Sequence, residues 1–186
     1  MVLHLAFLLN RSFTEPVHED DLAASEGEIA EWDLLKPESY YPTFTLPRSR
    51  AEGRAFPEIW TLAPHHTIGL QYFHIAQIVL IIAKQRQRPL NGGRLFDTIA
   101  ADRKRERQIR DHLCTIVGLA ISNPKAENTL FTASHCLSVW AACLRRKVDQ
   151  DAALTFLEGM GARTGWKTST LILALRRQWR EDSESG

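Results

Sequence analysis

The segment from His65 to Lys84 constrains the fold of this chain more than any other. It contains no proline, its only glycine is Gly69, and apolar residues occupy most of its faces. A helix of this kind is stable in water only when other elements cover it. Polar residues interrupt its longest apolar stretch, 68–83, which is shorter than the roughly 18 to 20 residues needed to cross a membrane. We therefore predict the buried central helix of a globular protein, and no membrane partner.

The chain after this segment predicts further amphipathic helices. Residues 88–93 contain Pro89, Gly92 and Gly93 and predict a turn. Beyond the turn, apolar residues recur every three or four positions, as on one face of a helix. Helices are expected from about 101 to 122, from about 126 to 147, from 149 or 151 to a left-handed glycine at 161 or 165, and around 171–179. The second of these is expected to carry Arg145, Arg146 and Lys147 in its last turn, which suits the helix dipole.

The chain before the central helix divides into three parts. The apolar start, 1–10, predicts a helix fragment. Residues 14–31 hold seven acidic residues and neither Lys nor Arg, which predicts a solvated lead-in to a short amphipathic element with Trp32, Leu34 and Leu35. Five prolines between Pro37 and Pro64 disfavour helix, so extended or looped chain is expected there.

Strand-like alternation of apolar and polar residues lasts nowhere long enough to build a sheet. The predicted fold is all-α, an irregular array of about five to seven packed amphipathic helices with no sheet. We assign residues 1–31 to an N-terminal fragment with the acidic lead-in, 32–180 to one helical domain, and 181–186 to a polar tail.

Charge is balanced overall and concentrated at one place. The 23 Lys and Arg against 22 Asp and Glu give a formal net charge of +1, so no global field draws the chain to nucleic acid. The local exception is a group of five basic residues: Arg103, Lys104, Arg105, Arg107 and Arg110. This group is the candidate site for contact with nucleic acid or a protein partner. The alternative is a solvated helix face, since no aromatic residues interleave with it.

The sequence offers little for catalysis or metal binding. The three cysteines, Cys114, Cys136 and Cys143, have neither disulfide-framework nor zinc-site spacing, and we expect buried apolar residues. His65, His66 and His74 are interpreted as capping or hydrogen-bonded core residues, with a metal ligand or base as the alternative. No phosphate-binding loop or nucleophile elbow occurs. We expect no catalytic residue, metal ligand or cofactor; His74, His112 or His135 beside a buried carboxylate would favour an enzyme instead.

Four groups of residues together resemble the C-terminal part of the fungal-specific transcription factor domain, which occurs in fungal binuclear zinc cluster transcription factors. The groups are Trp32 with 36–42 (KPESYYP), 56–76 (from FPEIW to IGLQYFHIA), 109–123 (ending CTIVGLAISN), and 164–166 (TGW) with Trp179. The order of the groups matches that family, and the resemblance spans about 32–179. Trp140, Trp166 and Trp179 lie on amphipathic stripes and are expected in the core.

The resemblance implies a non-enzymatic regulatory domain, located in the nucleus and acting in transcription regulation. In that family six cysteines with C-x2-C-x6-C spacing hold two zinc ions and bind DNA, and this chain lacks them. The expected partners are proteins of the transcription machinery or a second copy of the chain, together with a small-molecule effector between helices. DNA would be a partner only if a zinc cluster were supplied elsewhere.

The resemblance also implies a truncated or mis-started member of that family, or a paralogue that kept only the regulatory part. Part of the apolar surface of the central helix should then stay open, and the chain should self-associate or need a partner. The alternatives to a regulatory domain are direct DNA contact through the basic helix 103–110 and an enzyme of unrecognised type.

Overall fold

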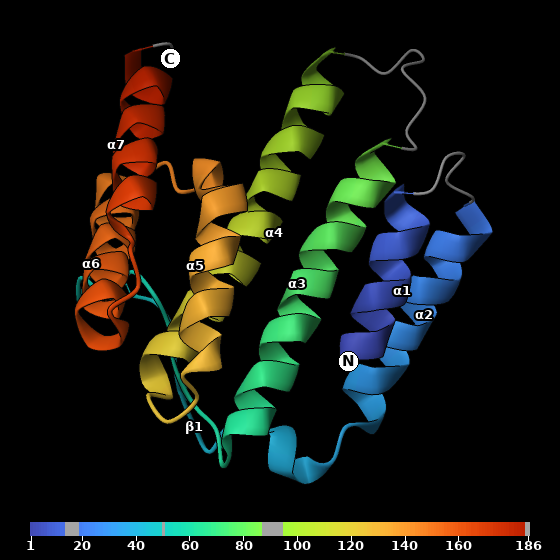
Figure 1. Ribbon diagram of the computed structural model, residues 1–186. Coiled ribbons are helices and arrows are strands. Elements are labelled where there is room, and N and C mark those ends of the chain that lie inside the picture. Colours follow the sequence, from blue (N-terminus) through green and yellow to red (C-terminus); the bar gives the residue numbers. More distant parts are fainter. Residues whose placement is uncertain (14–18, 50, 87–94, 185–186) are drawn as a thin grey trace.

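Seven α-helices make up most of the part of the chain that the structure describes (Figure 1). The computed structural model describes residues 1–13, 19–49, 51–86 and 95–184. The helices are α1 (Val2–Phe13), α2 (Glu19–Leu35), α3 (Pro64–Arg86), α4 (Leu95–Ser122), α5 (Asn128–Trp140), α6 (Lys147–Thr164) and α7 (Ser169–Glu184). Two short 3-10 helices, η1 (Glu38–Tyr40) and η2 (Ala141–Cys143), lie between them. The all-α prediction is confirmed, and the turn predicted at 88–93 falls outside the described residues.

The predicted central helix is α3, which occupies the middle of the molecule (Figure 1). The α1–α2 pair packs on one side of α3, while α4 and α5 pack on the other, with α6 and α7 beyond them. By length and composition alone α3 is apolar enough to cross a membrane, so the expectation that its apolar stretch is too short is wrong. The core helices of soluble proteins meet the same criterion.

The two largest hydrophobic cores among the described residues both include side chains of α3. The larger one packs α3 against α4, α5, α6 and α7 and includes Ile78 and Leu137. The smaller one packs α3 against α1 and α2 and includes Leu8, Leu22 and Ile29. Residues 19–35 are therefore a packed helix rather than a solvated lead-in, because Leu22 and Ile29 are buried in the smaller core. The start of the chain is helical, as predicted.

A two-stranded antiparallel sheet corrects the prediction of no sheet. Strand β1 (Phe44–Leu46) pairs with β2 (Glu58–Trp60), with Thr45 opposite Ile59. The prolines hold this stretch extended, and Gly53, at φ +68°, allows the chain to reverse. Side chains at the end of α4 also hold β2: the Ile59 amide donates to Ser122 Oγ at 3.0 Å, and Asn123 Nδ2 donates to the Ile59 carbonyl at 2.7 Å.

The helix predicted over 126–147 ends earlier, at Trp140, and continues only as η2. Leu144 is fully buried with φ −84° and ψ 79°, a backbone conformation that no helix contains. Its carbonyl accepts a hydrogen bond from Gln150 Nε2 at 2.8 Å. The three basic residues therefore lie at the start of α6, not in the last turn of α5. Packing of Leu144 explains the break.

The C-terminal helices follow the prediction more closely. Helix α6 ends at Gly165, whose φ of +72° and N–H bond to the Gly161 carbonyl at 2.9 Å form the expected left-handed cap. In α7 the side chain of Trp179 is buried and its indole N–H donates to the Ala141 carbonyl at 3.0 Å. Residues 181–184 of the predicted polar tail are still helical. The last two residues lie outside the described part.

Candidate functional site

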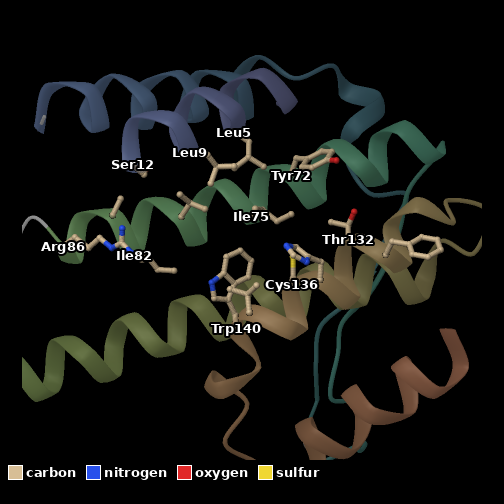
Figure 2. Close-up of a pocket in the computed structure, with 15 residues that line it drawn as sticks. Leu5, Leu9, Ser12, Tyr72, Ile75, Ile82, Arg86, Thr132, Cys136 and Trp140 are labelled. Carbon is tan, nitrogen blue, oxygen red and sulfur yellow. The ribbon is translucent and has the colours of Figure 1, made fainter. Parts of the chain in front are cut away.

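A groove of about 730 Å³ lies between α1, α3 and α5 (Figure 2). It exists because α1 and α5 each pack against α3 but leave a space between themselves. Most of its lining is apolar: Leu5, Leu9, Ile75, Val79, Ile82, Ala83, Phe131, Cys136, Val139 and Trp140. Positions 75, 79 and 82 of α3 are spaced as one face of a helix, so the open part of the central helix's apolar surface faces this groove.

Polar groups are few and stand mainly at the two ends of the groove. Figure 2 shows Ser12 and Arg86 at one end and Tyr72 and Thr132 at the other. His135 completes the polar lining, and no Asp or Glu is present among the described residues that line the groove. The arrangement suits an elongated, mainly apolar occupant.

Ser12 is the unusual member of this lining. Its side chain belongs to the last turn of α1 and the residue is only 5% exposed. Its Oγ has no hydrogen-bond partner among the described residues. Buried hydroxyl groups almost always have a partner, so this one is an exception among the described residues. No sequence pattern predicts it, because a serine in an apolar helix is ordinary.

The cysteines are buried and unpaired, as predicted. Cys136 lies in the floor of the groove (Figure 2). Burial raises the pKa of all three thiols to about 12. The thiolate is the reactive form of cysteine, so these side chains are poor nucleophiles at neutral pH.

His74 and His112 face each other between α3 and α4. Their Nδ1 atoms are 2.9 Å apart, so one ring donates a proton and the other accepts it. Burial, together with the neighbouring His112, lowers the pKa of His74 to about 3. Burial also lowers the pKa of His112, against the opposing effect of Asp111. Both rings are therefore neutral at neutral pH.

A histidine beside a buried carboxylate would favour an enzyme, and among the described residues His74, His112 and His135 have no such neighbour. Asp33 and Asp111, the carboxylates that act on the His74–His112 pair, are largely exposed rather than buried. His135 lies on the rim of the groove, which has no acidic lining residue in the described part of the chain. His66 is buried, and its Nδ1 has no hydrogen-bond partner among the described residues. The predicted role of a hydrogen-bonded core residue therefore fits His74 but not the Nδ1 of His66.

Among the residues whose burial the structure describes, the buried carboxylate is that of Asp149, which the sequence pattern did not indicate. Arg48 Nη2 donates to Asp149 Oδ1 at 2.7 Å, and Arg48 Nη1 donates to Cys114 Sγ at 3.1 Å. This contact ties the proline-rich segment to α6 and α4. No local pattern could have paired residues so far apart in the sequence.

The five basic residues of the candidate nucleic-acid site lie on the first half of α4 but do not form one continuous face. Arg103, Lys104 and Arg107 are exposed. Arg105 pairs with Asp102, and Arg110 lies 3.7 Å from Asp111. Glu106, within the same run, is bound by Arg145, whose Nη2 is 3.0 Å from Glu106 Oε2. Acidic neighbours thus neutralise part of the group.

The expectation of a core position is wrong for Trp166. This residue is 59% exposed and meets the ring of Phe131 edge-on, with centroids 5.4 Å apart. Trp166 follows Gly165, where the chain has left α6, so no helix face carries it inward. Trp179 is buried as expected, and Trp140 forms part of the groove wall.

No family model, no curated protein and no solved structure matches this chain. The fold and the groove therefore define it as a mainly helical protein with an apolar groove of ligand size.

Proposed function

We propose that this chain is the regulatory domain of a fungal transcription factor, and that it works in the nucleus without catalysis. A small molecule binds in the groove between α1, α3 and α5 and changes the contact between the domain and a protein of the transcription machinery. The observation that carries this proposal is the groove itself. Its volume, about 730 Å³, falls within the roughly 300 to 1,000 Å³ of small-molecule sites.

The position of the groove supports a regulatory role. Its two walls, α1 and α5, belong to different hydrophobic cores, which meet at α3. An occupant that touches both walls favours the spacing of α1 and α5 that it fits best, because a ligand stabilises the conformation to which it binds more tightly. The outer surfaces of the same helices would then present that spacing to a partner.

The chemistry of the lining supports binding rather than catalysis. The raised pKa of Cys136 keeps its thiol protonated. The remaining titratable side chains in the lining, Tyr72, Arg86 and His135, come from separate positions along the groove and include no carboxylate among the described residues. A non-enzymatic role is consistent with this set.

The transcription-factor part of the proposal draws on the sequence resemblance, whose residue groups pack together. The ring of Trp32 lies 5.6 Å from that of Tyr40 and 5.8 Å from that of Phe73. A side chain at Gly118 would collide with the carbonyl of Pro57. Residues quoted from three of the four groups therefore contact one another, which supports a common structural unit.

The test uses the whole chain fused to an unrelated DNA-binding domain in a fungal reporter strain. Val139 lines the groove and is 56% exposed, so Val139→Asp places a charge in the groove with little effect on the core. Val148, on α6, is 59% exposed and outside the groove, which makes Val148→Asp the matched control. We expect the fusion to change reporter expression, Val139→Asp to lose most of that change, and Val148→Asp to retain it.

Circular dichroism of both purified variants checks that they keep the helical fold. A fusion that leaves the reporter unchanged would contradict a regulatory function. If the Val139→Asp fusion is folded and changes reporter expression as much as the unsubstituted chain does, the regulatory function does not depend on the groove.

A further inference from the structure

We propose that the occupant of the groove is a long-chain carboxylate of the fatty-acid class. Its carboxylate lies beside the guanidinium of Arg86, and its hydrocarbon chain lies along α3 toward Tyr72. This inference rests on the function proposed above and adds the chemical class and the orientation of the ligand.

The charge of the lining selects the head group. Arg86 is the one Lys or Arg among the described residues that line the groove, and no Asp or Glu is among them. Figure 2 shows Arg86 at one end of the groove, near Ser12. A carboxylate at this end pairs with the guanidinium and meets no acidic lining residue in the described part of the chain. An ammonium group at the same place meets a like charge and no described anion of the lining.

The other basic residues at the ends of these helices bind α2 and do not line the groove. Arg11 Nη1, in the last turn of α1, lies 3.6 Å from Glu28 Oε1, and Lys84 Nζ, in the last turn of α3, lies 2.5 Å from Glu26 Oε1. With Arg86, they offset the partial negative charge of the two helix C-termini, which would otherwise repel a carboxylate. Arg86 is exposed and carries five N–H donors, so the contact that it already makes leaves donors for a ligand.

The rest of the lining selects the body of the ligand. The lining residues of α3 extend from Tyr72 to Arg86, a span of about 21 Å at a rise of about 1.5 Å per residue. The side chains between them are predominantly apolar. A hydrocarbon chain fills such a space and gains affinity from every methylene group that leaves water. Nucleotides and other polar polyanions fit poorly, because this lining offers them one cation and a mainly apolar wall.

The experiment compares decanoate, decanol and decylammonium, which share one hydrocarbon chain, by calorimetric titration into the full-length chain below their aggregation concentrations. The head groups differ in hydration, so the quantity compared between variants is the ratio of decanoate affinity to decanol affinity. We expect this ratio to fall about fivefold in Arg86→Met, since an exposed ion pair contributes up to about 1 kcal/mol and tenfold in affinity corresponds to about 1.4 kcal/mol. Decylammonium should bind more weakly than decanoate.

Two further variants make the result specific to Arg86. Lys84→Met is the matched control, because Lys84 is also exposed in the last turn of α3 but lies outside the groove, and its ratio should be unchanged. Arg86→Lys keeps the positive charge and should keep most of the preference for decanoate. Added salt should lower the ratio in the unsubstituted chain but not in Arg86→Met, because salt screens ion pairs. Circular dichroism checks that each variant keeps the helical fold.

An unchanged ratio in Arg86→Met, or an equal fall in Lys84→Met, overturns the inference about the head group. If Val139→Asp then still abolishes probe binding and the reporter response, the proposed function stands without the carboxylate. If no probe binds while Val139→Asp abolishes the reporter response, a protein segment rather than a fatty acid fills the groove, and the inference fails. An unsubstituted fusion that leaves the reporter unchanged is the separate result that contradicts the proposed function.

Discussion

Buried polar side chains of this chain have very different surroundings. Gln71 on α3 is almost fully buried, and its Nε2 donates to the carbonyls of Ile116 at 2.9 Å and Thr129 at 3.2 Å. It therefore links α3 to α4 and α5. Ser12 has no partner at all among the described residues, whereas His74 depends on one other imidazole. Gln71 therefore stabilises the fold, and Ser12 keeps a hydroxyl group without a hydrogen bond. His74 makes stability sensitive to acid.

The acid sensitivity follows from the pKa of His74. In the unfolded chain this histidine has a pKa near 6.5, and in the folded chain its pKa is about 3. Between these values the unfolded chain binds the proton and the folded chain does not, so the free energy of unfolding falls as the pH is lowered. Stability is fully present above about pH 6.5, and the loss continues down to about pH 3. We expect a loss of about 1 to 2 kcal/mol between pH 6.5 and pH 5.

Urea unfolding at a series of pH values measures this effect. His74→Gln keeps a hydrogen-bonding group beside His112 but cannot take up the proton, so its free energy of unfolding should depend less on pH. His135→Gln, on the exposed rim of the groove, is the control for loss of an imidazole. The same slope in His74→Gln as in the unsubstituted chain would show that the acid sensitivity arises elsewhere.

At the scale of elements, local sequence patterns predicted the helices and helix ends that depend on residues close together in the chain. The apolar periodicity of 101–122 and the glycine at 165 identified the body of α4 and the end of α6. The strand β2 was missed because its partners, Ser122 and Asn123, lie far away in the sequence. The groove was missed for the same reason, since its width depends on how α1 and α5 rest on α3. Contacts between distant segments leave no periodic trace.

The contact between α4 and the proline-rich segment leads to a prediction about two glycines. Gly118 faces Pro57, and a Cβ there would collide with the Pro57 carbonyl and approach its ring. Gly159, in α6, has open space where its Cβ would be. We expect Gly118→Ala to lower the free energy of unfolding by about 1 to 3 kcal/mol through overpacking. Gly159→Ala should raise it by about 0.5 to 1 kcal/mol, because alanine favours helix.

Urea denaturation of the two variants beside the unsubstituted chain gives both values. The pair is informative because the chemical change is the same and only the surroundings differ. Equal effects of the two substitutions would mean that α4 does not pack closely on the Pro57 segment.

For the whole molecule, the distribution of charge argues against direct binding to DNA. The formal net charge is +1, and acidic neighbours pair with Arg105 and Arg110. Non-specific DNA binding depends on several unpaired cations that release counterions together. We expect no retarded band when a mixed-sequence duplex is incubated with the purified chain at about 150 mM salt.

Electrophoretic mobility shift over a salt series measures this directly. The control is a triple alanine variant of Arg103, Lys104 and Arg107, the exposed basic residues of the group. A band whose retardation weakens steeply with salt and disappears in that variant would make the basic helix the functional site, in place of the groove.

The two walls of the groove are made at different times during synthesis. Residues 5–12 of α1 leave the ribosome early, while residues 131–140 of α5 follow only after α2, α3 and α4. A nascent chain that ends before α5 carries the apolar face of α3 but no complete site beside it. Since domains fold as they emerge, the groove can form only after α5 has joined α1 and α3. A ligand of the groove would therefore bind chains that include α5 and not those interrupted before it.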